Sequence, residues 1–176
     1  MRSFQRRRST YSHTRKRDNP EARFQKLVIK SFKEQFHGKC HLRETDPEMA
    51  IATGGRSARN KGRPDIVGHV YGLHVEIELK MDGNYPSVDQ KREIRLVTNT
   101  GGIAFAMVHD RKKGIYYAVM DVDNFSYRHR EGWIKLTHIQ HKEMGLILLE
   151  PINYLLLSKA QQLHRLFTET PEGEEE

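Results

Sequence analysis

The feature that most constrains the fold is the stretch Val75-Glu76-Ile77-Glu78-Leu79-Lys80, in which apolar and charged residues alternate strictly. Alternation with a period of two is typical of a β-strand whose two faces meet different surroundings. The three apolar residues are predicted to enter a core, whereas the two glutamates and the lysine share the opposite face. Successive residues on one face lie about 6.6–7 Å apart, so Glu78 and Lys80 can flank one small ligand.

A second short strand is predicted at Ile66-Val67, and the turn around Gly72 is near enough to join the two strands as a hairpin. This hairpin would bring Asp65 beside Glu78 and Lys80. Two carboxylates and a lysine on one patch suit a magnesium ion and a water molecule held next to a phosphate. The alternative is an ordinary cross-strand ion pair among the same three residues.

The spacing of these residues resembles the motif of the PD-(D/E)XK nuclease superfamily, which is an Asp, a gap and then Glu-X-Lys. Here the motif is Asp65, twelve intervening residues and then Glu78-Leu79-Lys80. Together with Gln90 and Gly101-Gly102, it is most similar to the VRR-NUC branch, a group near the archaeal Holliday junction resolvases. The similarity covers residues 20–108 and implies an α/β fold with a restriction-endonuclease-like core, a central mixed β-sheet flanked by helices.

The resemblance also implies a role for each residue of the motif. Asp65, Glu78 and the main-chain carbonyl of Leu79 would ligate Mg²⁺, for which Mn²⁺ can substitute. Lys80 would orient or deprotonate the attacking water and stabilise the pentavalent phosphate.

Two further residues have both an ordinary and a catalytic interpretation. Glu21 lies in the first turn of a helix that Asn19-Pro20 opens, where an acid complements the helix dipole; in the resembled family, a first-helix Glu reaches the metal. Gln90 completes a capping box with Ser87, whereas the family places a Gln here in the active site.

The composition favours a polyanionic partner. The 176 residues carry a net charge of +7, which attracts nucleic acid above all, although soluble basic proteins share this property. A single cysteine excludes an internal disulfide, and no apolar run approaches a membrane span. We therefore expect an intracellular, soluble and cytoplasmic protein, with a virus or phage as one candidate source.

The chain divides by composition into a disordered basic arm at residues 1–18, a nuclease-like domain at 19–168 and an acidic disordered tail at 169–176. Residues 43–61 form a long polar stretch that is predicted to be a basic flap or a solvated loop. Basic residues of this stretch and of the following helix are candidates for nucleic-acid binding. They are Arg56, Arg59, Lys61, Arg63, Lys91, Arg92 and Arg95.

The other elements are predicted from hydrophobic periodicity and from the residues that start or end helices and strands. Helices are predicted from Pro20 to Gly38, from Ser87 to Gly101 and over 151–167. Strands are predicted at 39–42, 103–108, 115–122 and 133–139, with a short apolar stretch at 146–149. The histidines are interpreted as scattered surface residues.

These observations favour a metal-dependent endonuclease that hydrolyses DNA, and the resemblance implies branched or junction structures as its substrates. A resolvase must cut two strands symmetrically, so a homodimer is expected. One alternative is a restriction-type or nicking endonuclease with the same core. The other is a basic nucleic-acid-binding protein without catalysis.

Overall fold

The structure, a computed structural model, describes residues 19–45, 62–140 and 145–168. The basic arm, most of the 43–61 stretch and the acidic tail, with Arg56, Arg59 and Lys61, lie outside these residues. The elements in chain order are α1 (Pro20–Gln35), β1 (Cys40–Glu44), β2 (Ile66–Val70), β3 (Leu73–Met81), α2 (Val88–Asn99), β4 (Ile103–Asp110), β5 (Ile115–Val119), β6 (Trp133–Leu136), β7 (His138–Ile139), β8 (Leu146–Ile147) and α3 (Glu150–Thr168).

Six strands form one sheet in the order β1-β2-β3-β4-β5-β6. Only β3 and β4 pair in parallel, and α2 connects them, whereas the other neighbours are antiparallel. This confirms the predicted α/β fold with a central mixed sheet. The remaining two strands, β7 and β8, pair with each other in a separate small sheet.

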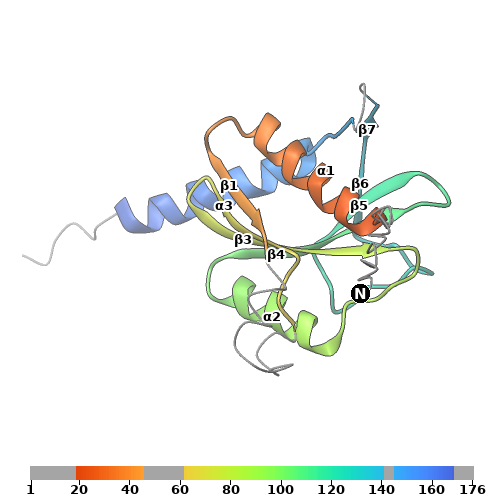
Figure 1. Cartoon of the computed structure of the whole chain (residues 1–176). Helices are drawn as coiled ribbons and strands as arrows, with labels where there is room; N and C mark the ends of the chain where they lie inside the picture. The colour runs from red at the N-terminus through yellow and green to blue at the C-terminus, as the bar shows by residue number, and fades with distance from the viewer. Residues whose placement is uncertain (1–18, 46–61, 141–144, 169–176) are drawn as a thin grey trace, which may run out of the picture.

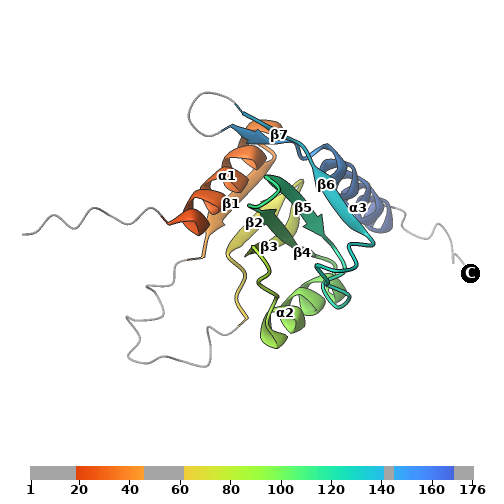
Figure 2. The same ribbon diagram turned by 90° about the vertical axis from the view of Figure 1, so that its right-hand side faces the viewer.

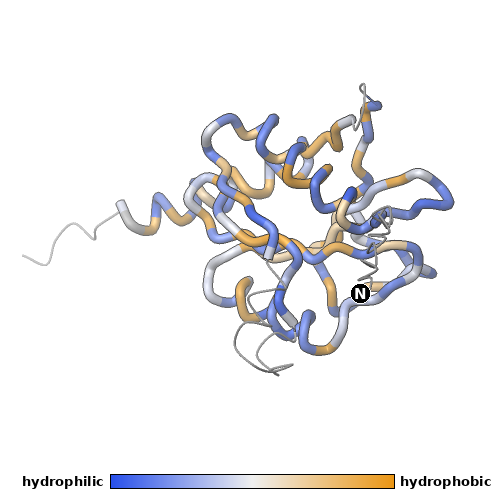
Figure 3. The backbone as a smooth tube through the Cα atoms, in the orientation of Figure 1, coloured by the Kyte–Doolittle hydropathy of each residue, from blue (hydrophilic) through white to orange (hydrophobic). Residues whose placement is uncertain are grey.

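The helices cover the two faces of the sheet (Figures 1 and 2), with α1 and α3 on one side and α2 on the other. Figure 3 shows hydrophobic stretches along the central strands. The larger core lies under α1 and α3 and includes Phe32, Ile77, Phe105 and Leu156. The smaller core lies under α2, where Ile94 and other apolar side chains meet Ala104, Ala106 and Val108 of β4. Because both faces are covered, every residue of β3 except His74 and Lys80 is buried.

Polar side chains of α1 form hydrogen bonds with the main chain of the segment from β8 to α3. The Ser31 hydroxyl is fully buried, donates to the Leu27 carbonyl at 2.8 Å and accepts from the Ile147 amide at 2.9 Å. The Gln35 amide bonds the Ile147 carbonyl and the Leu149 amide. Since a buried backbone group without a partner is costly, these bonds fix where the chain crosses α1.

The β2–β3 hairpin is the element that aligns the site. Val70 pairs with Leu73, and the two residues between them, Tyr71 and Gly72, both have positive φ, 54° and 80°. Positive φ at both positions matches the type I′ turn, whose twist suits a two-residue hairpin. The predicted hairpin is confirmed, and its register is set by this turn.

Several boundaries differ from the sequence prediction, and β5, for example, ends at Val119 rather than at residue 122. The first edge strand runs on to Glu44, because it pairs with β2 as far as Ile66. The predicted strand 133–139 is two strands, β6 and β7, which belong to different sheets. The helix α3 begins at Glu150, one residue before its proline. Among the described residues, no helix is long and apolar enough to cross a membrane.

Candidate active site

The hairpin brings Asp65 and Glu78 to adjacent positions on neighbouring strands. Ile66 pairs with Ile77 across β2 and β3, so Asp65 and Glu78 follow as the next cross-strand neighbours. The Asp65 carboxylate also accepts a hydrogen bond from the Leu79 amide at 2.7 Å. The predicted pair of carboxylates is therefore brought together on the α2 side of the sheet.

Two other elements hold the main chain of Asp65. Its carbonyl accepts from the Gln25 side-chain amide at 2.8 Å and from the Thr45 amide at 3.0 Å. The Thr45 hydroxyl also donates to the carbonyl of Pro64. Helix α1 and strand β1 thus position the start of β2, on which Asp65 sits.

Gln25 was not predicted from the sequence. It lies one helical turn after Glu21, on the same side of α1. This i, i+4 spacing could have indicated that Gln25 faces the site that was predicted for Glu21. Glu21 itself is exposed in the first turn of α1, and its amide is capped by the Asn19 side chain at 3.0 Å. The structure therefore shows the ordinary capping geometry around Glu21 and places Gln25, rather than Glu21, in contact with Asp65.

Glu78 is 2% exposed. Its Oε1 accepts from Lys80 Nζ at 2.5 Å and from Gln90 Nε2 at 2.5 Å. Its Oε2 is buried and has no hydrogen-bond partner within the described residues. A buried carboxylate oxygen without a partner is costly, so this atom would gain from a ligand.

The surroundings raise the pKa of Glu78 to about 8. Burial is the main cause, because it disfavours the charged carboxylate, and repulsion from Asp65 adds to it. Lys80 opposes both effects but does not overcome them. A cation bound between Asp65 and Glu78 would relieve this repulsion and favour the charged form of Glu78.

Gln90 both caps α2 and contacts Glu78, although the sequence suggested that these two roles were alternatives. Its Oε1 accepts from the Ser87 amide at 2.8 Å, and the Ser87 hydroxyl accepts from the Gln90 amide, which completes the capping box. Its Nε2 donates to Glu78. A side-chain amide has one accepting and one donating end, so capping α2 and fixing Glu78 are compatible.

The candidate nucleic-acid-binding residues that the structure describes have different surroundings. Arg63 and Arg92 are exposed. Lys91 donates to the Asp123 carbonyl at 3.2 Å, and Arg95 lies 3.7 Å from the Asp123 carboxylate. Both of these side chains are therefore partly engaged by the loop that follows β5.

Glu76 has a base beside it, which was not predicted from the sequence. His74 Nε2 lies 3.1 Å from Glu76 Oε1, whereas the buried Oε2 has no partner among the described residues. Burial is the first cause of the raised pKa of Glu76, and Glu93 on α2 adds repulsion. Glu76 and Glu93 line a cavity of about 350 Å³ that also reaches Pro64, next to Asp65.

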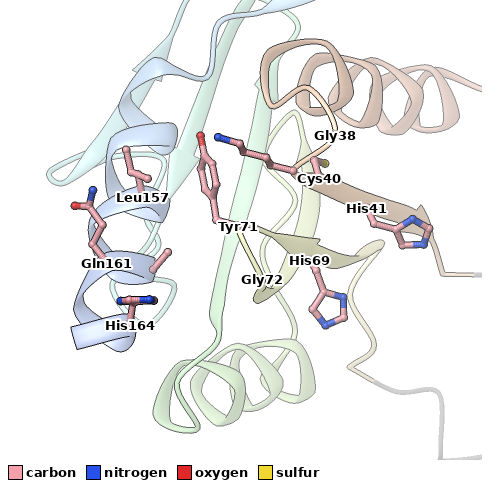
Figure 4. A pocket seen from close by; sticks show the side chains of 11 residues that line it. Gly38, Cys40, His41, His69, Tyr71, Gly72, Leu157, Gln161 and His164 are labelled. Carbon is pink, nitrogen blue, oxygen red and sulfur yellow. The ribbon is translucent and has the colours of Figure 1, made fainter. Parts of the chain in front are cut away.

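Three histidines form a cross-strand row rather than a scatter. His41 pairs with His69, and His69 pairs with His74. In the close view of a second cavity, of about 630 Å³ between α3 and the β1–β2 edge (Figure 4), His41 and His69 project from neighbouring strands. Within the part of the chain that the structure describes, no group of three or more His, Cys, Asp or Glu side chains is arranged to hold a metal ion.

Several solved structures resemble this chain. The chain is similar to Hjc, a Holliday junction resolvase from the archaeal hyperthermophile Archaeoglobus fulgidus, at 18% sequence identity and a TM-score of 0.43. The alignment covers 77% of this chain and 97% of the resolvase. No family model matches the sequence, and the search of curated proteins also finds no match.

The chemistry of the acidic pair fits a hard divalent cation. Mg²⁺ is usually bound by one or two carboxylates and keeps several waters, so Asp65 and Glu78 meet its needs without a third acidic side chain. The unpartnered Glu78 Oε2 supplies a free ligand atom. The main-chain carbonyl of Leu79 remains a predicted third oxygen.

Proposed function

We propose that this protein is a metal-dependent endonuclease that hydrolyses phosphodiester bonds in DNA. The observation that carries the proposal is the juxtaposition of Asp65 and Glu78, with Lys80 Nζ 2.5 Å from Glu78 and a buried Glu78 oxygen left without a partner. An ordinary ion pair joins one acid to one base, whereas here two neighbouring carboxylates meet a single lysine, and the Asp65 charge raises the pKa of Glu78.

Asp65 and Glu78 would hold Mg²⁺, or Mn²⁺ in its place, with the Leu79 carbonyl as a further oxygen ligand. Such an ion supplies Lewis-acid chemistry, lowering the pKa of a water and neutralising charge on the phosphate. Glu21, which is exposed on α1, would contribute through water.

The protein's own residues prepare the site for the attack on phosphorus. Gln25 and Thr45 fix the main chain of Asp65, and Gln90 fixes the Glu78 carboxylate. Lys80 is half-buried beside the same carboxylate. Its ammonium group would orient the water and stabilise the negative charge that builds on the phosphate.

The motif's resemblance to the junction resolvases supports branched DNA as the substrate class and a homodimer with two sites as the working assembly. Arg63 and Arg92 are exposed and would contact phosphates, together with Lys91, Arg95 and the segment that contains Arg56, Arg59 and Lys61. A restriction-type or nicking endonuclease would use the same residues on unbranched DNA. A soluble intracellular protein is part of the same proposal.

The test is a cleavage assay with labelled four-way junction, flap and linear duplex DNA in Mg²⁺, Mn²⁺ or EDTA, with an RNA of the same sequence alongside. We expect metal-dependent products, most from the branched DNA, and a rate about 10²–10⁴-fold lower for Lys80→Ala if the lysine transfers a proton. Lys135→Ala, an exposed lysine on β6, is the matched control and should cleave at the wild-type rate. Tight binding without cleavage under every metal condition would replace this proposal with the non-catalytic nucleic-acid-binding protein.

A further inference from the structure

The loop that joins β3 to α2 presents an exposed aromatic ring. Tyr85 is 54% exposed, and Val88 beside it at the start of α2 is 80% exposed. The neighbouring Pro86 is buried. An exposed aromatic ring and an exposed aliphatic side chain three residues apart offer apolar surface that a partner can cover.

The ring is held in place by other aromatic side chains. Tyr85 makes edge contacts with Phe125, at a centroid distance of 5.6 Å, and with Tyr127, at 5.3 Å. The Tyr127 hydroxyl donates to the carbonyl of Asn84, one residue away, at 3.1 Å. Phe125 is 5% exposed, so the three rings of Tyr85, Phe125 and Tyr127 are anchored in the protein interior. Because its edges are packed, Tyr85 would lose little conformational entropy when a partner covers it.

The loop runs between two residues that contact the candidate active site. Lys80 and Gln90 both bond Glu78, and each is five residues from Tyr85. Five residues span at most about 18 Å, so the ring lies within reach of a nucleic-acid strand bound at Glu78. Exposed Arg92 on α2 and exposed Arg128, next to Tyr127, provide positive charge on the same elements for the phosphates of such a strand.

We propose that Tyr85 stacks on an unpaired base of the DNA strand, and that this contact makes the protein select branched over fully paired DNA. The inference rests on the proposed function, because it assumes that DNA is the substrate. It assigns to the β3–α2 loop a recognition role that is separate from catalysis.

Geometry explains why such a contact reads structure rather than sequence. Within a continuous duplex each base is already stacked on both faces, so a protein ring must first unstack a step, at a cost of a few kcal/mol. At a flap or branch point some bases lack a neighbour and offer a free π-face. Every base has such a face, so the contact tolerates any sequence.

The experiment measures binding in EDTA, where cleavage cannot occur, by fluorescence anisotropy of a fluorescein-labelled flap DNA and of a linear duplex of equal length. Tyr85→Ala should weaken binding to the flap by roughly 5- to 150-fold, the range for one base–aromatic stack. Its binding to the duplex should change by less than about twofold. Tyr85→Trp should bind like the wild type, whereas Tyr85→Leu, which keeps apolar bulk on Phe125 and Tyr127, should lose the same preference as Tyr85→Ala.

The matched control is Leu96→Ala, which removes a side chain that is 56% exposed at the other end of α2 and should leave both affinities unchanged. Wild-type binding of the flap by both Tyr85→Ala and Tyr85→Leu would overturn the inference. Wild-type binding by Tyr85→Leu alone would also overturn it, because bulk rather than a ring would then suffice. These binding results are independent of cleavage: if the wild type binds but never cleaves, the proposed activity fails while the role of Tyr85 is still decided by the same variants.

Discussion

The raised pKa of Glu78 predicts that the metal-free protein becomes less stable as the pH rises toward 8, and that Glu78→Gln removes this loss. In the folded chain Glu78 keeps its proton up to a pKa of about 8, whereas in the unfolded chain the carboxyl ionises near its model value of 4.5. Between these values the folded state binds one more proton than the unfolded state. The free energy of unfolding therefore falls as the pH increases through this window.

The magnitude follows from the two pKa values. One proton changes the stability by about 1.4 kcal/mol per pH unit, and Glu78 is almost fully protonated in the folded state at both pH 5 and pH 7. The unfolded carboxyl is already partly ionised at pH 5, which leaves a loss of about 2.5 kcal/mol between pH 5 and pH 7. For a domain of this size that corresponds to about 5–10 °C in Tm.

The assay is urea unfolding of the wild type and Glu78→Gln in EDTA at several pH values between 5 and 8. The glutamine can still accept from Lys80 and Gln90 but cannot ionise, so titrating groups that do not interact with Glu78 cancel in the difference between the two proteins. We expect this difference to shift by about 2.5 kcal/mol in favour of the variant from pH 5 to pH 7. A difference that stays constant across this range would show that Glu78 is ionised in the folded protein and would refute the electrostatic account of the site.

Three other substitutions test the packing around the site. Gly68→Ala should destabilise the protein by about 3 kcal/mol or more in urea unfolding, because a Cβ would lie 1.9 Å from the main-chain oxygen of His41; a stable variant would show that β1 and β2 are not this close. Ser31→Ala should cost about 1–3 kcal/mol in the same assay by leaving the buried Ile147 amide without its acceptor, and wild-type stability would mean that another group accepts from that amide. Gln25→Ala should lower the cleavage rate or the metal affinity by about 10–100-fold, the usual effect of losing a group that supports a ligand; unchanged values of both would leave Gln25 without a role in the site.

Local sequence signals predicted most of the fold because they act over a few residues. Asn19 and the following proline mark the start of α1, and the Ser87–Gln90 capping box marks that of α2. The alternation in 75–80 predicted the central strand, and Gly72 the hairpin that joins it to β2.

The contributions of distant segments could not be predicted in this way. Gln25 is forty residues from Asp65 in the chain, and no local pattern shows that α1 crosses β2 at that point. The division of 133–139 into β6 and β7 also depends on which strand each half pairs with. His74 is a different case, because it lies two residues before Glu76 on the same face of β3, so the two-residue period of the strand was enough to indicate this partner.

The bonds that Thr45 makes to Pro64 and Asp65 close the chain on itself at the base of the segment 46–61. The two ends of this insertion are thus fixed by the scaffold, and the free energy of closing a longer loop grows only slowly with its length. Evolution, or an engineer, can therefore lengthen, shorten or exchange the residues between these ends while both carboxylates keep their positions. A core built this way can accept a different segment between Thr45 and Pro64 without any change to the residues around Glu78.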